Sequence, residues 1–282
     1  MNIVVCLKQV LDPALVEFDI ATSELRAPRW RLDQLDCVAL EQALRCRSAA
    51  GAAVTVITVG PARTEEILRH GLTSGADRAI RVGGDAVEDA DAWVTAGILA
   101  AAVRRLEPDL VLCGARSSDS GGECLGAYLA AALDVAFIGR VVWLEPRGAA
   151  IAAHSREESG WREELHAALP VVAAVETALN EPRYVPMLSR VYREGARRSI
   201  ETWDVDELDV EAEVLVPRVV ALDLTQPKPR TKVGVKVTGL SMADKLKLMR
   251  GGRGGGQQRE LLKGNPAESA SRIVAKLDEW LA

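Results

Sequence analysis

Aromatic residues and long apolar runs are both scarce in this chain of 282 residues. Phe, Trp and Tyr together make up 4% of the sequence, so the core has to be built mainly from Ala, Val, Leu and Ile. The longest apolar stretches, such as residues 93–103, are much shorter than the roughly 20 residues that cross a bilayer. We therefore expect no direct insertion into a membrane.

The sequence also has no excess of positive charge. Its 35 Lys and Arg residues are outnumbered by 40 Asp and Glu residues, which gives a net charge of -5. Proteins that hold nucleic acid usually carry the opposite balance, so we expect no nucleic-acid partner. The first residues lack the basic and apolar regions of an export or organelle signal, and a cytoplasmic location is expected.

The cysteines and histidines form no recognisable metal or disulfide pattern. The number of cysteines is odd and none of them forms a C-x-x-C pair, while the histidines fall in no spacing typical of metal ligands. The residues concerned are Cys6, Cys37, Cys46, Cys113, Cys124, His70, His154 and His166. We expect reduced, buried thiols and no metal site.

Up to about residue 140, apolar strands alternate with longer helical stretches. This alternation predicts an open, mostly parallel sheet with helices on both faces, and thus an α/β fold. Strands are expected over 3–7, 53–59, 78–82 and 109–113, and helices over 33–51, 63–71, 91–106 and 127–133. The later strands, expected over 139–144, 150–154, 161–166 and 171–175, have the pattern of an antiparallel extension.

Composition divides the chain into three parts. Residues 1–176 form the α/β domain with its extension, and 177–250 form a long arm with several prolines. Residues 251–282 begin with a glycine-rich hinge and end in a helix whose apolar stripe includes Trp280. Because such a stripe needs a surface to bury it, we expect this helix to dock on a partner subunit or on the chain's own sheet.

A loop rich in Ser and Gly, residues 114–126, lies between an expected strand and an expected helix. This arrangement presents backbone N–H groups and the positive end of a helix dipole to an anion. The segments 6–10, 33–36 and 59–61 should meet the same sheet edge, where open parallel sheets bind ligands. We therefore predict a phosphate site, the alternative being that the loop only caps a surface helix.

Motifs that would indicate catalysis are missing from the sequence. There is no G-x-x-x-x-G-K-[ST], no G-x-G-x-x-G after the first strand, and no Ser, His and Asp set that can be placed in one cleft. The sequence thus favours binding over catalysis.

Four segments, 4–13, 32–43, 71–79 and the Leu-Asn-Glu-Pro-Arg-Tyr run at 179–184, occur in an order that resembles the beta subunit of electron-transferring flavoproteins. The resemblance covers about residues 1–250. It implies an adenine-nucleotide-binding fold, AMP bound in this chain, and a heterodimer with an alpha subunit that carries FAD. It also implies an electron carrier, not an enzyme, that accepts electrons from a partner flavin dehydrogenase.

The resemblance also implies which residues would act. The nucleotide-binding residues would be Cys6, Asp33, Gln34, Leu35, Asp36, Val59, Gly114, Ala115, Arg116, Ser117, Ser118, Asp119, Ser120, Gly121, Gly122, Glu123, Cys124 and Leu125. Met187 and Leu188 would form the apolar tip of the arm that contacts the dehydrogenase, unless they only pack beneath it.

This sequence departs from the family where the phosphate loop usually has a Thr and a Gln. It has Glu123, Cys124 and Leu125 there, so Ser117, Ser118 and Ser120 would have to supply the hydroxyls. Two alternatives stay open. One is the FAD-binding subunit of an electron-bifurcating flavoprotein that oxidises NADH, and the other is a stand-alone nucleotide-binding sensor.

Overall fold

A computed structural model describes residues 1–12, 14–19, 22, 24–26, 29–84, 87, 90–185, 198–219, 242, 265 and 269–274. The chain divides into two units, Met1–Gln226 and Pro227–Ala282. In the second unit, residues 269–274 are helical and expose Ile273 and Val274. Trp280, the expected anchor of the terminal helix, lies outside the described residues.

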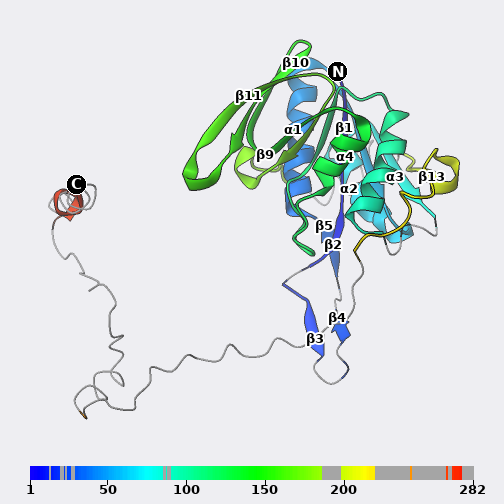
Figure 1. The fold of residues 1–282 in the computed structure, drawn as a ribbon, viewed down its shortest axis with the longest axis horizontal. Coiled ribbons are helices and arrows are strands. Elements are labelled where there is room, and N and C mark those ends of the chain that lie inside the picture. The colour runs from blue at the N-terminus through cyan, green and yellow to red at the C-terminus, as the bar shows by residue number, and fades with distance from the viewer. Residues whose placement is uncertain are drawn as a thin grey trace. The chain divides into compact units, whose positions relative to one another are not determined.

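The first unit is built on a nine-stranded sheet (Figure 1). The strands of this sheet are β1 (Asn2–Cys6), β6 (Ala53–Val59), β7 (Arg78–Gly83), β8 (Leu110–Gly114), β9 (Ala136–Arg147), β10 (Ala150–Arg156), β11 (Arg162–Ala168), β12 (Val171–Val175) and β13 (Glu201–Asp204). Their spatial order is β11-β10-β9-β12-β8-β1-β6-β7-β13. All neighbours from β9 to β13 in this order run parallel, whereas β10 and β11 extend the sheet antiparallel. The predicted α/β fold class is thus confirmed.

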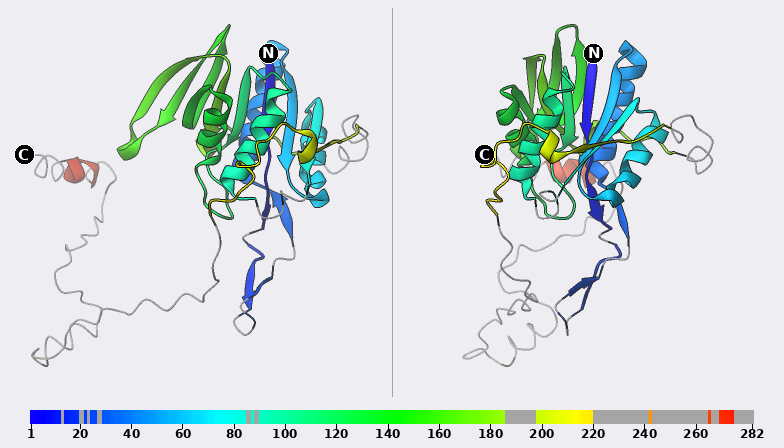
Figure 2. Two further views of the ribbon diagram at one scale, coloured as in Figure 1. Left: turned by 45° about the vertical axis from the view of Figure 1, so that its right-hand side comes forward. Right: turned by 90° about the vertical axis from the view of Figure 1, so that its right-hand side faces the viewer.

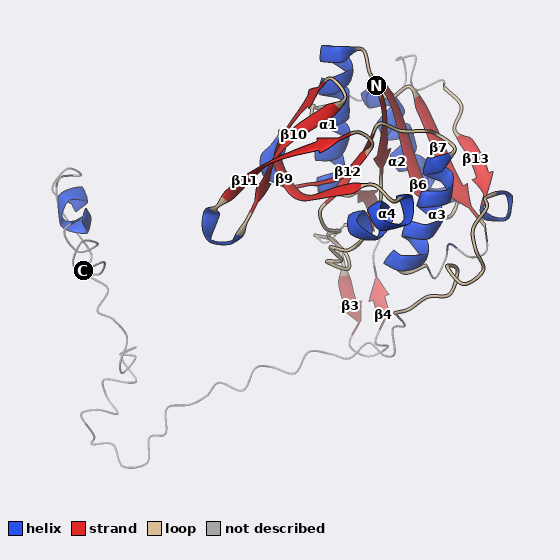
Figure 3. Cartoon of the chain, turned by 45° about the horizontal axis from the view of Figure 1, so that its top comes forward, coloured by secondary structure: helices blue, strands red, loops and turns tan. Residues whose placement is uncertain are grey.

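Helices cover both faces of the sheet. On one face lie α1 (Gln34–Ala50) and α2 (Glu65–Ser74), and on the other lie α3 (Ala92–Arg104) and α4 (Leu125–Leu133) (Figure 3). Two separate apolar cores follow from this, one on each face, and both consist mainly of Ala, Val, Leu and Ile. Strands with both faces covered read as continuous apolar runs, which is why the sequence predicted them well.

Helix ends follow the capping residues seen in the sequence. The carboxylate of Asp33 accepts a hydrogen bond from the N–H of Leu35, and Gly51 ends α1 with a left-handed φ of 65°. The helix expected over 63–71 is shifted. The Pro61 carbonyl accepts from both the backbone N–H and the hydroxyl of Thr64, which forms a 3-10 turn, η1 (Ala62–Thr64), before α2 begins.

The orientation predicted for the strand at 171–175 was wrong. β12 runs parallel to both of its neighbours, β8 and β9, instead of continuing the antiparallel extension. The short link after β11 suggested a hairpin, since parallel neighbours usually need long connections. However, all five residues of β12 are buried, because the strand is inserted into the middle of the sheet. Its unbroken Val-Val-Ala-Ala-Val run is typical of such a strand.

Three smaller strand pairings were not predicted. β13 joins the edge of the sheet beside β7. Two antiparallel ribbons pair β2 (Gln9–Leu11) with β5 (Trp30–Leu32) and β3 (Glu17–Asp19) with β4 (Glu24–Arg26). The β3–β4 ribbon stands away from the sheet (Figure 2). Among the described residues, no helix combines the length and apolar character that crossing a membrane requires.

Candidate functional site

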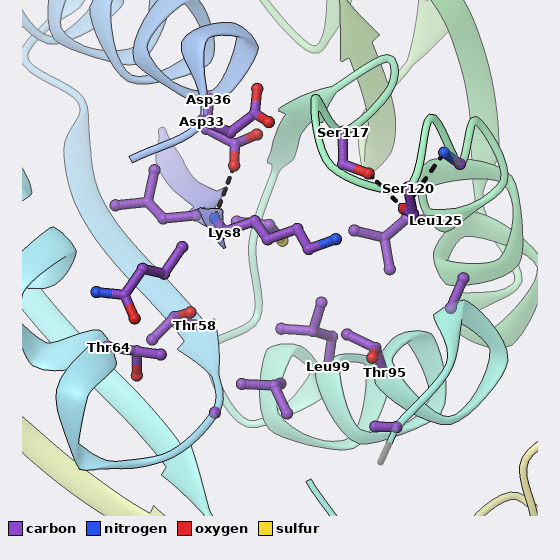
Figure 4. Close-up of a pocket in the computed structure, with 18 of the residues that line it drawn as sticks. Lys8, Asp33, Asp36, Thr58, Thr64, Thr95, Leu99, Ser117, Ser120 and Leu125 are labelled. Atoms are coloured by element: carbon purple, nitrogen blue, oxygen red, sulfur yellow. Dashed lines mark hydrogen bonds between the residues drawn. The ribbon is translucent and has the colours of Figure 1, made fainter. Parts of the chain in front are cut away.

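A cavity of about 490 Å³ opens at the carboxyl-terminal ends of β8, β1 and β6 (Figure 4). The strand ends contribute Gly114, Cys6 and Val59 to its lining, and α3 contributes Thr95 and Leu99. This edge is where open α/β sheets bind ligands, and the size suits a small organic molecule. The loops that the sequence placed at one sheet edge do meet around this cavity.

The structure brings only part of the predicted nucleotide-binding set to the cavity surface. The predicted residues that line it are Cys6, Asp33, Asp36, Val59, Gly114, Arg116, Ser117, Ser120, Gly122 and Leu125. The predicted residues outside the lining are Gln34, Leu35, Ala115, Ser118, Asp119, Gly121, Glu123 and Cys124. Several of the latter hold the lining residues in position.

Asp36 connects the loops after β1 and β8. One carboxylate oxygen accepts from the backbone N–H of Lys8 at 2.7 Å, and the other accepts from that of Gly114 at 3.0 Å. A Cβ atom at position 114 would stand 2.8 Å from the Asp36 carboxylate, so this position requires glycine. Burial, together with the charge of Asp33, raises the pKa of Asp36 to about 7 despite these two bonds.

Asp33 ties the serine-rich loop to the start of α1. Its second carboxylate oxygen accepts from both the backbone N–H and the hydroxyl of Ser118, at 2.7 and 2.8 Å. Ser118 is therefore a bracing residue of the loop, bound to Asp33. A substitution at Ser118 would disturb the loop with or without a ligand, which makes Ser117, in the lining, the better position for a test.

The positively charged side chain of Lys8 lies at the cavity, between Asp33 and Asp36 on one side and the serine-rich loop on the other. The Lys8 ammonium group is 2.7 Å from the Asp119 carboxylate. Partial burial raises the pKa of Asp119, but the hydrogen bonds from Lys8 and Ser120 outweigh this and hold the pKa below its ordinary value. In the same loop the hydroxyls of Ser117 and Ser120 are 2.8 Å apart. Lys8 and these hydroxyls supply polar donors on the side of the cavity that the loop forms (Figure 4).

The N-terminus of α4 faces the same side of the cavity. Its N-cap, Cys124, makes no side-chain capping bond, and Leu125, the first residue of the helix, lines the cavity. Uncapped N–H groups at a helix start, beside a lysine and hydroxyls, suit a phosphate group. We call this side, formed by Lys8, Ser117, Ser120 and the start of α4, the anion end. Its residues fit the phosphate of a nucleotide.

The sequence placed the segments 6–10 and 59–61 at this edge but missed other residues of the lining. These are Thr58, Thr64, Asp91 and Thr95. Asp91 follows β7 and caps α3, accepting from the N–H of Val94 at 2.9 Å, so its place after a parallel strand was a usable signal. The lining also includes Val219, more than a hundred residues later in the chain, and no local pattern indicates that contact.

The thiols near the cavity are not activated nucleophiles. Burial raises the pKa of Cys6, raises that of Cys113 to about 12 and raises that of Cys37 to about 11. All five cysteines are free, and the prediction of buried thiols holds for Cys6, Cys46 and Cys113 but not for Cys37 and Cys124, which are partly exposed. The described residues contain no group of three or more His, Cys, Asp or Glu side chains that could hold a metal ion.

The base of the predicted partner-binding arm is anchored on α1. The buried Glu41 carboxylate accepts from the Arg183 side chain at 2.6 Å, and the Asn180 side chain donates to the Val38 carbonyl at 3.1 Å. Hydrogen bonds from Arg183 and Arg45 hold the pKa of Glu41 below its ordinary value, although burial raises it. Met187 and Leu188, the predicted contact residues, lie outside the described residues.

Residues 24–208 match the family model described as electron transfer flavoprotein domain. An electron transfer flavoprotein subunit beta from Thermoanaerobacterium thermosaccharolyticum is 32% identical over 213 residues, covering 75% of this chain and 81% of that protein. The subunit beta from Bacillus subtilis is 26% identical over 280 residues, 98% of this chain and 97% of its own. A protein named FixA, from Azorhizobium caulinodans, is 31% identical over 221 residues, 75% of this chain and 78% of its own.

Proposed function

We propose that this chain, which belongs to the electron transfer flavoprotein family and matches its beta subunits, binds AMP in the cavity and pairs with an alpha subunit that holds FAD. As a member of this family, the chain is an electron-carrier subunit and not an enzyme. The bound FAD would supply the redox chemistry of the heterodimer. The AMP would have a structural role, filling the cavity and holding its loops together.

The continuity between the anion end and the rest of the cavity is the observation that carries this proposal. Lys8, Ser117, Ser120 and the uncapped start of α4 lie together, and the cavity extends from them past β1 to the loop after β6. A phosphate at the anion end would leave the remaining space to the sugar and base. Asp33 and Asp36 do not oppose this, since their carboxylates are engaged by backbone and serine donors.

The nucleotide is tested by purifying the chain together with its alpha subunit, denaturing the complex and identifying the released nucleotides by mass spectrometry. We expect one AMP for each copy of this chain and one FAD for each heterodimer. Two FAD molecules and no AMP would favour the electron-bifurcating alternative, and a chain that purifies without any alpha subunit would favour a stand-alone sensor.

For the electron donor, we propose a partner flavin dehydrogenase that contacts Met187 and Leu188. In support, the segment just before them is fixed to α1 by the Arg183–Glu41 pair, and Tyr184 is 85% exposed. Changing Met187 or Leu188 to Ala should slow electron delivery by roughly tenfold without lowering the thermal midpoint. This is the factor in affinity that burial of one apolar side chain contributes. A lower midpoint with unchanged transfer would instead mean that both residues pack inside the protein.

A further inference from the structure

One side of the cavity is formed by two segments that lie far apart in the chain. Asp91 and Thr95 line it at the start of α3, and Val219 lines it from the segment 211–219. The rest of the described lining comes from the first 125 residues of the chain. Figure 4 shows Thr95 and Leu99 on the α3 side of the cavity. Whether this side is complete therefore depends on how the segment 211–219 is held in place.

The Asp91 carboxylate holds the end of this segment. One of its oxygens caps α3 by accepting from the backbone N–H of Val94 at 2.9 Å. The other oxygen accepts from the backbone N–H groups of Arg218 and Val219, at 2.7 and 2.9 Å. Because both bonds from the segment go to one oxygen atom, they can form and break together.

Further contacts connect the segment with α3 and, through it, with α4. The Arg218 guanidinium lies 3.7 Å from the ring centre of Trp93, on α3. Val214 packs against Gly97 of the same helix. The Trp93 ring in turn meets the ring of Tyr128, on α4, edge to face, with 5.6 Å between the ring centres. Since the start of α4 belongs to the anion end, a row of contacts joins the segment to the helix that would hold the phosphate.

The segment itself contains no fully buried residue. Each residue from 211 to 219 is at least partly exposed to solvent, and Val216 and Val219 are 61% and 75% exposed. Segments with few buried contacts open locally at a low cost in free energy while the rest of the protein stays folded. We therefore expect the segment to detach and dock again without a change in the sheet.

We propose that the segment 211–219 is a gate of the nucleotide cavity, so that the nucleotide enters and leaves only while the segment is detached from Asp91 and Trp93. The inference rests on the proposed function, since it takes the cavity as the AMP site. A nucleotide in the cavity in turn stabilises the docked segment, because the coupling between two binding events is reciprocal. Bound AMP is then exchanged slowly, at a rate set by the detachment of the segment.

The test measures how fast bound AMP is exchanged in the complex of the full chain with its alpha subunit. The complex is loaded with AMP that carries a heavy-isotope label and is then mixed with an excess of unlabelled AMP. Samples taken over time are desalted and denatured, and mass spectrometry gives the ratio of the two forms. Because each sample provides its own ratio, losses during handling do not change the measured rate.

Two variants should loosen the segment without changing the lining of the cavity. Arg218→Ala removes the contact with Trp93 and should speed exchange by about two- to fivefold, the factor that an exposed cation–π contact supplies. Gly97→Ala places a methyl group against Val214 and should speed exchange by at least about fivefold. None of these residues lines the cavity, so neither variant removes a contact with the nucleotide.

Each variant has a matched control. For Arg218→Ala it is Arg104→Ala, which should exchange AMP at the wild-type rate. Arg104 is the last residue of α3, lies outside the lining, and donates through its guanidinium to the carbonyl oxygen of Ala132. For Gly97→Ala the control is the addition of Val214→Ala, which removes the colliding methyl group and should restore slow exchange.

Exchange at the wild-type rate in either variant overturns the gate and leaves the nucleotide site standing. Equally fast exchange in Arg104→Ala also overturns it, since the effect would then not depend on the segment. If Arg218→Ala or Gly97→Ala prevents the heterodimer from forming, the segment is part of the fold and the gate is overturned as well. A wild-type complex that retains AMP in neither form overturns the proposed function together with this inference.

Discussion

In each of two walls of the cavity, an aspartate caps a helix and also binds a second segment of the chain. The two aspartates differ in how deeply they are buried. In the first wall, Asp33 caps α1 and also binds the serine-rich loop through Ser118. In the second, Asp91 caps α3 and also accepts from the backbone N–H groups of Arg218 and Val219. Asp33 is 2% exposed, whereas Asp91 is only partly buried and Val219, whose N–H it binds, is 75% exposed. A fully buried aspartate makes the first wall part of the fold, and a partly exposed one makes the second wall separable from it.

The second wall is a segment that we call the strap, residues 211–219. It crosses α3, where Val214 packs against Gly97 and Leu215 reaches the apolar core of that face. The Arg218 guanidinium lies 3.7 Å from the ring centre of Trp93. The strap contributes Val219 to the cavity lining, and because its contacts lie outside the sheet, we expect that it can be displaced without unfolding the protein.

The largest expected effect comes from breaking the first wall. Asp33→Ala should lower the free energy of unfolding by about 3 kcal/mol, because it removes a helix cap and the charged acceptor of both Ser118 bonds. Asp91→Ala is the matched variant in the second wall and should cost about 1 kcal/mol. Urea unfolding of both variants measures the difference, and equal losses would show that burial does not separate the two walls.

A pH effect specific to the first wall is expected next. Because the pKa of Asp36 is raised to about 7 in the folded protein, the folded state binds a proton more tightly than the unfolded state does. Its contribution to the free energy of unfolding should therefore fall as pH rises from about 4 to about 7, by roughly 1.4 kcal/mol per pH unit at the steepest.

Asp36→Asn removes this titration. As pH rises from about 4 to about 7, the free energy of unfolding should therefore fall in the wild type relative to that of the variant. Urea unfolding at several pH values gives both curves. Parallel curves would mean that Asp36 keeps an ordinary pKa. The cavity thiols do not complicate the result, since the pKa values of Cys6 and Cys113 lie above this range.

A variant with a smaller effect on stability should show that the strap can detach while the rest of the protein stays folded. A Cβ atom at Gly97 would collide with Cγ1 of Val214, so Gly97→Ala should displace the strap. Overpacking of this kind costs roughly 1–3 kcal/mol, which weakens docking of the strap by about fivefold to 150-fold. Trypsin should then cleave after Arg218 faster, while the thermal midpoint stays the same or rises, because Ala favours helix.

Adding Val214→Ala to Gly97→Ala removes the colliding methyl group and should restore slow cleavage. If the double variant is cleaved as fast as the single one, the contact between Val214 and Gly97 does not hold the strap. If Gly97→Ala unfolds the protein, the strap is part of the fold and the comparison between the two walls fails.

The smallest effect on stability should come from Lys8, which lies in the first wall but is not buried. Both side chains of the Lys8–Asp119 pair are partly exposed to solvent, so Lys8→Met should change the free energy of unfolding by less than about 1 kcal/mol. It should nevertheless reduce nucleotide retention by about tenfold through the loss of a charged donor, and Lys8→Arg should retain it. A stability loss as large as that of Asp33→Ala would give Lys8 a structural role instead.

The two walls also differ in how far the sequence predicted them. The first wall follows local rules, because an N-cap aspartate, a strand end and a Ser- and Gly-rich loop are all visible in short segments. The strap and β12 depend on long-range packing. Val214 contacts Gly97 although more than a hundred residues separate the two in the chain. The link before β12 is as short as a hairpin loop, although β12 pairs in parallel. Gln9 belongs to the segment 6–10 that the sequence placed at the cavity, but its bond to the Arg63 carbonyl is a long-range contact that no local pattern indicates.

The most direct test of the central claim, that the anion end of this cavity holds the phosphate of AMP, compares Ser117→Glu with Ser117→Gln. The two side chains are nearly equal in size, and only Glu brings a negative charge to the phosphate. Nucleotide released from the two purified heterodimers is quantified by mass spectrometry. The account predicts AMP in the Gln variant and at least tenfold less in the Glu variant, since one unfavourable charge contact corresponds to roughly that factor. Full AMP occupancy in both variants would contradict it.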